Sequence, residues 1–137
     1  MPEQIKHIKQ LEEIIEVIEE IEKDAECNLD DQCSNVVKNA AKFQPTDEQI
    51  DAIVNFFYVM SDKTRLRIIN LLESGDLCVG HITETLGMTQ SAVSHQLAIM
   101  KRLNLIKAKK EGRNTIYSLS DEHINIVFDI ALKHVCE

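Results

Sequence analysis

The sequence is poor in the residues that form turns. Its 137 residues include four Gly, two Pro and no Trp. Such a composition leaves little room for a turn-rich fold built only from β-strands. No apolar run approaches the length that spans a bilayer, and the first 24 residues are too acidic for a signal peptide. We therefore expect a mainly helical, cytoplasmic protein that does not contact a membrane.

Cysteine is also scarce, with four residues at positions 27, 33, 78 and 136. In a cytoplasmic protein, these are better treated as thiols or metal ligands than as a disulfide framework. The sequence contains no Gly-rich phosphate loop and supplies no nucleophile, and a metalloenzyme would need an open coordination position with a general base. We expect neither enzymatic activity nor a small-molecule substrate.

The formal net charge is -8, but the charged residues are unevenly distributed. Residues 1–46 hold eleven Asp and Glu against five Lys and Arg, whereas residues 89–118 hold six basic residues and one acidic residue. A basic patch on an otherwise acidic protein is compatible with binding of DNA phosphates and disfavours promiscuous association.

The segment from Thr89 to Arg102 predicts an amphipathic helix. Val93, Leu97 and Met100 recur at helical spacing, and Thr89 is a candidate N-cap. Short polar side chains on the opposite face suit the edges of bases in a DNA major groove. An alternative role for His95 is a structural cap. The residues that we expect to contact DNA are Gln90, Ser91, Ser94, His95, Gln96, Lys101, Arg102, Lys109 and Arg113.

The chain before residue 46 predicts a separate extension. Residues 3–23 form a helical pattern with an apolar seam, which is too short for an independent coiled coil and is expected to pack on the domain or on a second subunit. The polar segment Glu26–Ser34 is expected to be a loop or short turn that carries Cys27 and Cys33, and a connector follows as far as Pro45. We therefore predict an amino-terminal helix and Cys-bearing extension over residues 1–45, followed by one domain over residues 46–137.

The order of elements after residue 46 is that of a winged helix-turn-helix. We expect a helix opened by Thr46, a helix capped by Ser61 or Asp62, a short helix over Cys78–Leu86, the polar-faced helix, a hairpin and a terminal helix capped by Ser120 or Asp121. The hairpin strands are expected at Leu105–Lys110 and Thr115–Leu119. This fold is mainly α with a small β-hairpin wing. A winged helix used only for protein interactions would not need the basic wing formed by Lys107, Lys109, Lys110 and Arg113.

Five motifs follow one another along this domain: Asp62-Lys-Thr-Arg-Leu-Arg67, Leu77-Cys-Val-Gly-His-Ile82, Leu86-Gly-Met-Thr-Gln-Ser-Ala-Val-Ser-His-Gln-Leu97, Glu111-Gly-Arg-Asn-Thr-Ile-Tyr-Ser-Leu119 and Asp121-Glu-His123. In these motifs the chain resembles the ArsR/SmtB family of metal-responsive repressors, in its zinc- and cadmium-sensing branch. The resemblance implies a homodimer that binds a palindromic DNA operator when metal-free and leaves it when metal binds. It also implies that the regulated genes serve metal efflux or resistance.

The terminal helix matches the family's metal site at Asp121, His123, His134 and Glu137. The two histidines are eleven residues apart, roughly 16 Å along a straight helix, so one ion cannot reach both of them in one subunit. If the helix pairs antiparallel with its symmetry mate, Asp121 and His123 meet His134 and Glu137 across the dimer. This nitrogen and oxygen ligand set suits Zn(II).

A second candidate metal site combines Cys78 and His81 with Cys27 and Cys33 of the extension. Thiolate ligands would admit Cd(II), Pb(II) or Zn(II), and the absence of a Cys-x-Cys pattern argues against arsenite sensing. Alternatively, Cys78 is a small buried apolar residue and the other two are free thiols.

The predicted function is therefore a repressor that is released from its operator by Zn(II), or by Cd(II) or Pb(II). The alternative is a winged-helix repressor that senses oxidants through Cys27, Cys33 or Cys78.

Overall fold

The computed structural model describes residues 2–24, 26 and 28–137, and Cys27 lies outside these residues. The chain divides into two compact units, residues 1–46 and residues 47–137, which we describe separately. None of the helices within the described residues is long and apolar enough to cross a membrane.

The first unit consists of helices α1 (Pro2–Lys23) and α2 (Asp30–Ala41). Helix α1 confirms the helix predicted over residues 3–23. The predicted loop and connector are wrong for residues 30–41, because Cys33 lies within helix α2. Two acidic residues in the first turn of α2 and Lys38 in its last turn complement the helix dipole, and no Gly or Pro interrupts the segment.

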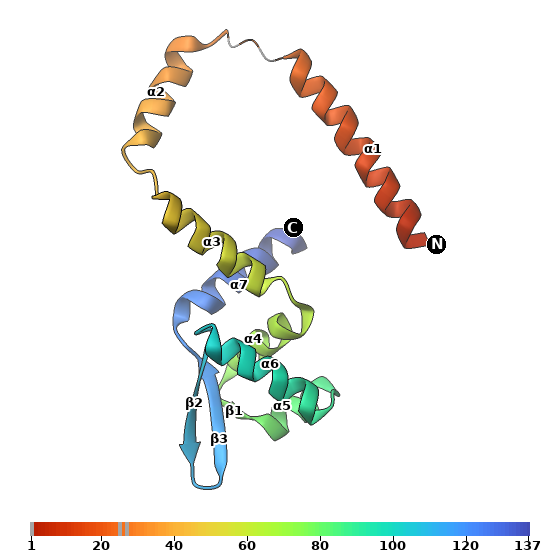
Figure 1. Cartoon of the computed structure of the whole chain (residues 1–137), viewed down its shortest axis with the longest axis vertical. Coiled ribbons are helices and arrows are strands. Elements are labelled where there is room, and N and C mark those ends of the chain that lie inside the picture. Colours follow the sequence, from red (N-terminus) through yellow and green to blue (C-terminus); the bar gives the residue numbers. More distant parts are fainter. Residues whose placement is uncertain (1, 25, 27) are drawn as a thin grey trace. The chain divides into compact units, whose positions relative to one another are not determined.

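The second unit confirms the predicted winged helix-turn-helix (Figure 1). Its strands form one antiparallel sheet in the order β1-β3-β2. In chain order, the elements are α3 (Asp47–Met60), α4 (Lys63–Ser74), β1 (Leu77–Cys78), α5 (Val79–Leu86), α6 (Gln90–Arg102), β2 (Ile106–Glu111), β3 (Asn114–Leu119) and α7 (Glu122–Cys136).

The wing is a tight hairpin, and the sequence pattern did not reveal a third strand that pairs with the middle of β3. Glu111 pairs with Asn114, which leaves a two-residue turn with Gly112 at a φ of +61°. Strand β1 spans only two residues, and Leu77 and Cys78 pair with Tyr117 and Ile116. A pair of residues is too short to show the alternation by which a strand is recognised.

Helix boundaries in the second unit follow the predicted capping residues. Asp62 accepts a hydrogen bond from the backbone N–H of Arg65 at 2.9 Å, and Thr89 accepts one from that of Ala92 at 3.2 Å. Asp121 caps α7 in the same way, through the N–H of His123 at 2.8 Å. Helix α5 ends at Gly87, whose φ of +64° lies in the left-handed region.

The core of the second unit forms between helices α4, α5 and α6 and the base of the sheet. The predicted apolar stripe of α6 is confirmed, because Val93, Leu97 and Met100 are each at most 1% exposed. Near its end, helix α3 contacts this core through Phe56, Val59 and Met60. Its earlier apolar residues, among them Ile50 and Ile53, are exposed.

Two carboxyl groups meet where α4 packs against α7. A hydrogen bond with Asp129 raises the pKa of Glu73 above its ordinary value of 4.5, desolvation and the negative charge of Asp129 add to this effect, and Asn125 opposes it. Protonation of Glu73 is therefore favoured in the folded state, so this pair contributes stability in acid that is lost as the pH rises through the pKa of the folded protein.

We predict that Glu73→Gln raises the midpoint of thermal unfolding at pH 7.5. The amide keeps a hydrogen-bond donor for Asp129 and removes the repulsion between two carboxylates. The advantage over the wild type is expected to shrink toward pH 4, where the wild-type Glu73 becomes protonated. Circular dichroism melts at both pH values measure the effect, with Glu84→Gln on the exposed surface of α5 as the matched control. Identical midpoints for Glu73→Gln and the wild type at pH 7.5 contradict the prediction.

Candidate nucleic-acid interface and metal sites

Helix α6 presents the polar surface that the sequence predicted for DNA contacts. Gln90, Ser91, Ser94 and His95 are exposed on its first two turns, while its apolar stripe is buried against the core. A two-residue turn, Gly87 and Met88, separates α5 from the N-cap of α6. A helix that is anchored on one face and bears short polar side chains on the other can enter a major groove.

Gln96 differs from the other predicted contact residues because the domain already uses its side chain. It is half-buried, and its Oε1 accepts a hydrogen bond from Nε of Arg65 at 3.0 Å. Nη1 of the same arginine donates to the carbonyl oxygen of Val59 at 2.9 Å. Arg65 thus connects the end of α3, the start of α4 and the polar face of α6. This role was missed from the sequence, where Arg65 stood out only as part of the Asp62–Arg67 motif.

Positive charge surrounds the wing and the end of α6. Lys101 and Arg102 are exposed in the last turn of α6, and Lys109 and Arg113 are exposed on the hairpin. Lys107 and Lys110 are also exposed. Within the described part of the chain, none of these six cations forms an ion pair. Unpaired cations on two neighbouring elements can follow a phosphate backbone on either side of a groove.

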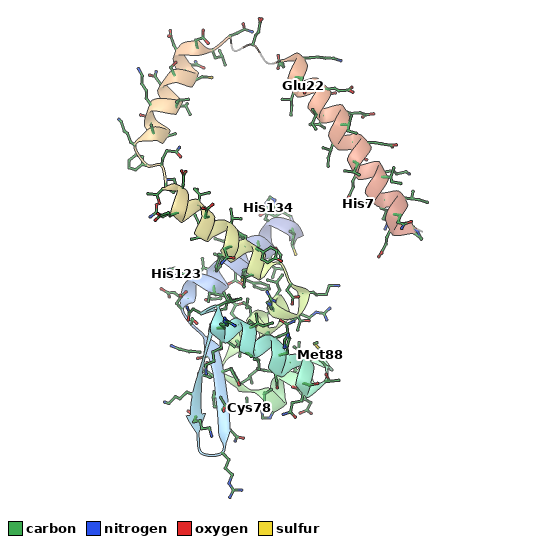
Figure 2. All side chains as sticks on the ribbon, viewed as in Figure 1. His7, Glu22, Cys78, Met88, His123 and His134 are labelled. Carbon is green, nitrogen blue, oxygen red and sulfur yellow. The ribbon has the colours of Figure 1, made fainter. Side chains whose placement is uncertain are left out.

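The predicted ligands on α7 lie at its two ends, as the labels of His123 and His134 show (Figure 2). Oδ1 of Asp121 is 3.2 Å from Nδ1 of His123, and the His123 side chain is 82% exposed. His134 and Glu137 are exposed at the other end. Among the residues that the structure describes, no three His, Cys, Asp or Glu side chains are grouped so that they could hold one metal ion. A complete site at α7 therefore requires ligands from a second subunit.

The cysteine-containing candidate site is represented by one close pair. Sγ of Cys78 lies 3.1 Å from Nδ1 of His81, at the start of α5. Cys78 is half-buried and His81 is exposed. Cys33 belongs to the other unit of the chain, and Cys27 lies outside the described residues. The pair supplies a soft sulfur donor and a nitrogen donor, which is half of a tetrahedral site.

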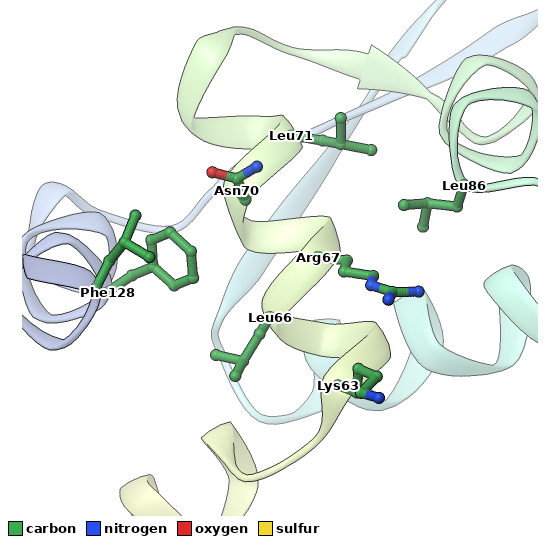
Figure 3. Close-up of a pocket in the computed structure, with 8 residues that line it drawn as sticks. Lys63, Leu66, Arg67, Asn70, Leu71, Leu86 and Phe128 are labelled. Atoms are coloured by element: carbon green, nitrogen blue, oxygen red, sulfur yellow. The ribbon is translucent and has the colours of Figure 1, made fainter. Parts of the chain in front are cut away.

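An apolar hollow runs along the contact between α4 and α7. One part is a cavity of about 370 Å³, where Lys63, Arg67 and Asn70 accompany apolar side chains of α4, α5 and α7 (Figure 3). A second part, of about 390 Å³, is lined by residues of α3, α4 and α7, including Phe57 and Val135. Leu66, Phe128 and Leu132 line both parts. These linings contain no nucleophile paired with a base, so they do not form a hydrolytic site.

The fold, the polar-faced helix and the basic wing define a winged-helix DNA-binding protein. The profile of the family described as "bacterial regulatory protein, arsR family" matches residues 62–108. The chain is also similar to the "transcriptional repressor SmtB homolog" of Synechocystis sp., with 34% identity over 66% of this chain and 68% of the relative. The chain belongs to the ArsR family of transcriptional regulators, which are DNA-binding proteins and not enzymes.

Two further comparisons agree with this assignment. The regulator NmtR of Mycobacterium tuberculosis is 37% identical over 66% of this chain and 76% of its own length. The "cadmium resistance transcriptional regulatory protein CadC homolog" of Staphylococcus aureus is 32% identical over 77% of this chain and 84% of the relative. The solution structure of apo-NmtR superposes with a TM-score of 0.58 over 67% of this chain and 78% of that chain, at 38% identity.

We predict that the wing and α6 contribute differently to DNA affinity. Lys109→Gln and Arg113→Gln are expected to weaken binding to all sequences alike and to reduce the salt slope by about 0.9 for each phosphate that the variant no longer neutralises. Ser94→Ala is expected to leave that slope unchanged and to cost about 1–3 kcal/mol of discrimination between operator and scrambled DNA. Anisotropy titrations at several salt concentrations measure both quantities, with Lys42→Gln of the first unit as the control. If the salt slope is unchanged in both wing variants, the wing does not contact phosphates and the prediction is wrong.

We predict that Arg65→Met lowers the free energy of unfolding by about 1.5–3 kcal/mol, because it removes a charged donor from Val59 and Gln96. Arg67→Met makes the same exchange at an exposed position of α4 and is expected to change stability by less than about 0.5 kcal/mol. Urea unfolding compares the two variants. If both variants lose the same free energy of unfolding, the hydrogen bonds of Arg65 do not stabilise the fold.

Proposed function

We propose that this protein is a cytoplasmic, metal-responsive transcriptional repressor. In the proposed cycle, a metal-free homodimer occupies a palindromic operator, and Zn(II) binding releases it. The regulated genes would then be expressed for metal efflux or resistance. The observation that carries the proposal is the distribution of donors on α7, with Asp121 and His123 exposed at one end and His134 and Glu137 exposed at the other.

The apolar surfaces of the second unit support a dimer formed through α3 and α7. Exposed apolar side chains that lie close together commonly mark an interaction site. Phe57 of α3 and Val127 and Val135 of α7 line one hollow, so the exposed apolar residues of the two helices lie close together. A two-fold dimer also presents two copies of α6 to successive major grooves. The exposed apolar residues are Ile50, Ile53, Val54, Phe57, Tyr58, Ile126, Ile130, Leu132 and Val135.

Zn(II) fits the proposed ligand set on α7. Two imidazoles and two carboxylates complete a tetrahedral site when the helices of two subunits run antiparallel, and the symmetry then creates two equal sites. The hydrogen bond from the His123 N–H to Asp121 fixes the carboxylate beside the imidazole before a metal arrives. Bound Zn(II) would therefore act as a bridge between two α7 helices, and it would favour one subunit arrangement.

The fold supplies a route from α7 to the DNA-contacting surface. Helix α7 follows β3 directly and packs on α4, which carries Arg65. Arg65 in turn contacts Gln96 on α6. A coupling free energy of about 1–3 kcal/mol along such a path would weaken DNA binding about 5- to 150-fold.

A thiol-sensing repressor is the second candidate function, and the Cys78–His81 pair favours it. The thiol of Cys78 lies 3.1 Å from an imidazole nitrogen of His81, and reactive cysteines are often found beside a histidine. Reduced HlyU of Vibrio cholerae, a structure with a TM-score of 0.60 and 26% identity over 66% of this chain and 96% of that chain, has the same fold. With metal in place of oxidant, the same pair would contribute to a Cd(II) or Pb(II) site together with Cys27 and Cys33.

The deciding experiment is DNA binding by fluorescence anisotropy at fixed salt. The probe is a labelled palindromic fragment selected from random-sequence DNA with metal-free protein. We expect Zn(II) to weaken wild-type binding about 5- to 150-fold, and His123→Ala to abolish this response without changing metal-free affinity. Cys78→Ser is expected to retain the Zn(II) response and to alter only the response to Cd(II).

Two controls accompany the metal experiment. His7→Ala removes an exposed histidine of α1, and Cys136→Ser removes a cysteine outside both proposed sites; both variants are expected to behave as the wild type. Loss of the Zn(II) response only in Cys78→Ser would move control to the cysteine site. A wild type that ignores Zn(II) and Cd(II) but is released by diamide would overturn metal sensing and establish the thiol switch.

A further inference from the structure

Helix α1 exposes an apolar seam along its middle turns, from Ile8 to Ile18. Ile8, Leu11, Ile15 and Ile18 follow one another at spacings of three, four and three residues, which is the spacing of a coiled-coil seam. Their side chains are 55%, 49%, 54% and 46% exposed. No residue of α1 is buried within the described part of the chain. A helix whose stability depends on covering such a seam requires a partner surface.

The seam is symmetric about Glu13. Leu11 and Ile15 lie two residues to either side of it, and Ile8 and Ile18 lie five residues to either side. When two copies of the helix run antiparallel around an axis at Glu13, Ile8 therefore lies opposite Ile18 of the second copy, and Leu11 lies opposite Ile15. Four apolar layers result, each combining two different positions of the repeat, as antiparallel packing requires.

The basic and acidic residues of α1 lie in different halves of the helix, and this distribution favours an antiparallel pair of α1 helices. Residues 2–11 contain two Lys and one Glu, whereas residues 12–23 contain six Glu and one Lys. A parallel pair would place the two acidic segments side by side. An antiparallel pair places each acidic segment beside Lys6 and Lys9 of the second copy, and like charges along a shared seam are avoided.

We propose that α1 is a dimerisation element that pairs antiparallel with α1 of a second copy of the chain. Two such short helices are marginal as a free pair in water. Inside a dimer they are held at high effective concentration, so the pairing adds to the affinity of the two subunits for each other. The perpendicular two-fold axis of this pair is compatible with the two-fold axis of a repressor dimer.

Disulfide trapping in the full-length protein tests the orientation. In a background with all four native cysteines changed to Ser, Ile8→Cys with Ile18→Cys places two thiols opposite each other across the pair. Within one helix these positions are about 15 Å apart, beyond disulfide reach. With metal chelated, mild oxidation is expected to give a covalent dimer of the double variant, whereas either single variant stays monomeric on non-reducing gels. Efficient crosslinking of Ile8→Cys alone would establish a parallel pair and overturn the proposal, as would the absence of crosslinking in the double variant.

A substitution pair on the native background tests the contribution of the seam to dimer affinity. Ile15→Glu places a charge in the seam, and Val17→Glu places the same charge on the opposite side of the helix, where Val17 is 52% exposed. Sedimentation of metal-free protein is expected to show a dimer dissociation constant raised about 100-fold by Ile15→Glu and less than about twofold by Val17→Glu. Equal effects of both variants would overturn the proposal. Release from DNA by Zn(II) is a separate readout, so failure of the α1 pair leaves the metal response to be judged by the α7 variants.

Discussion

The guanidinium group of Arg65 connects the helices that this regulator has to coordinate. It donates hydrogen bonds to the carbonyl of Val59 at the end of α3 and to Gln96 on α6, while Asp62 caps the helix that carries it. Because Val59 lies in the core and accepts a hydrogen bond from Arg65, this side chain links the end of α3 to helix α6. The planar fork of arginine suits two acceptors in different directions, which the point charge of lysine does not.

The short strand β1 connects the wing to the helix-turn-helix. Cys78 pairs with Ile116 of β3 and is also the residue before α5, so backbone hydrogen bonds join the hairpin to the start of the helix-turn-helix. Helix α7 follows the end of β3, whereas Cys78 pairs near the middle of this strand. A ligand at α7 and a ligand or oxidant at Cys78 would therefore both act on β3, so the fold is compatible with either kind of sensor.

Local chemistry made much of the second unit predictable, and long-range contacts mark where prediction ended. Asp62, Thr89 and Asp121 begin helices because their side chains accept from nearby backbone N–H groups, and such bonds depend only on neighbouring residues. Helix α2 was missed although Cys33, Val36, Val37, Ala40 and Ala41 recur at helical spacing, because the polar residues at its start were interpreted as a loop. The link from Arg65 to Gln96 spans 31 positions, so no local pattern shows it. The metal site on α7 stays a prediction, because its two halves lie at opposite ends of the helix, as the sequence indicated, and only a second subunit could bring them together.

In the proposed function, the acidity of the whole chain would let a modest coupling free energy act as a switch. With a net charge of -8, the protein gains little from general attraction to DNA, so we expect its affinity to come from the basic wing and α6 in correct register. In a dimer, both half-sites have to be engaged together for the combined affinity to exceed that of one half-site. A change in the angle between subunits disengages one half-site without altering any contact residue. In the proposed mechanism, a metal that bridges two α7 helices would need to alter only this angle, and the net negative charge of the chain would then keep the released protein off non-operator DNA.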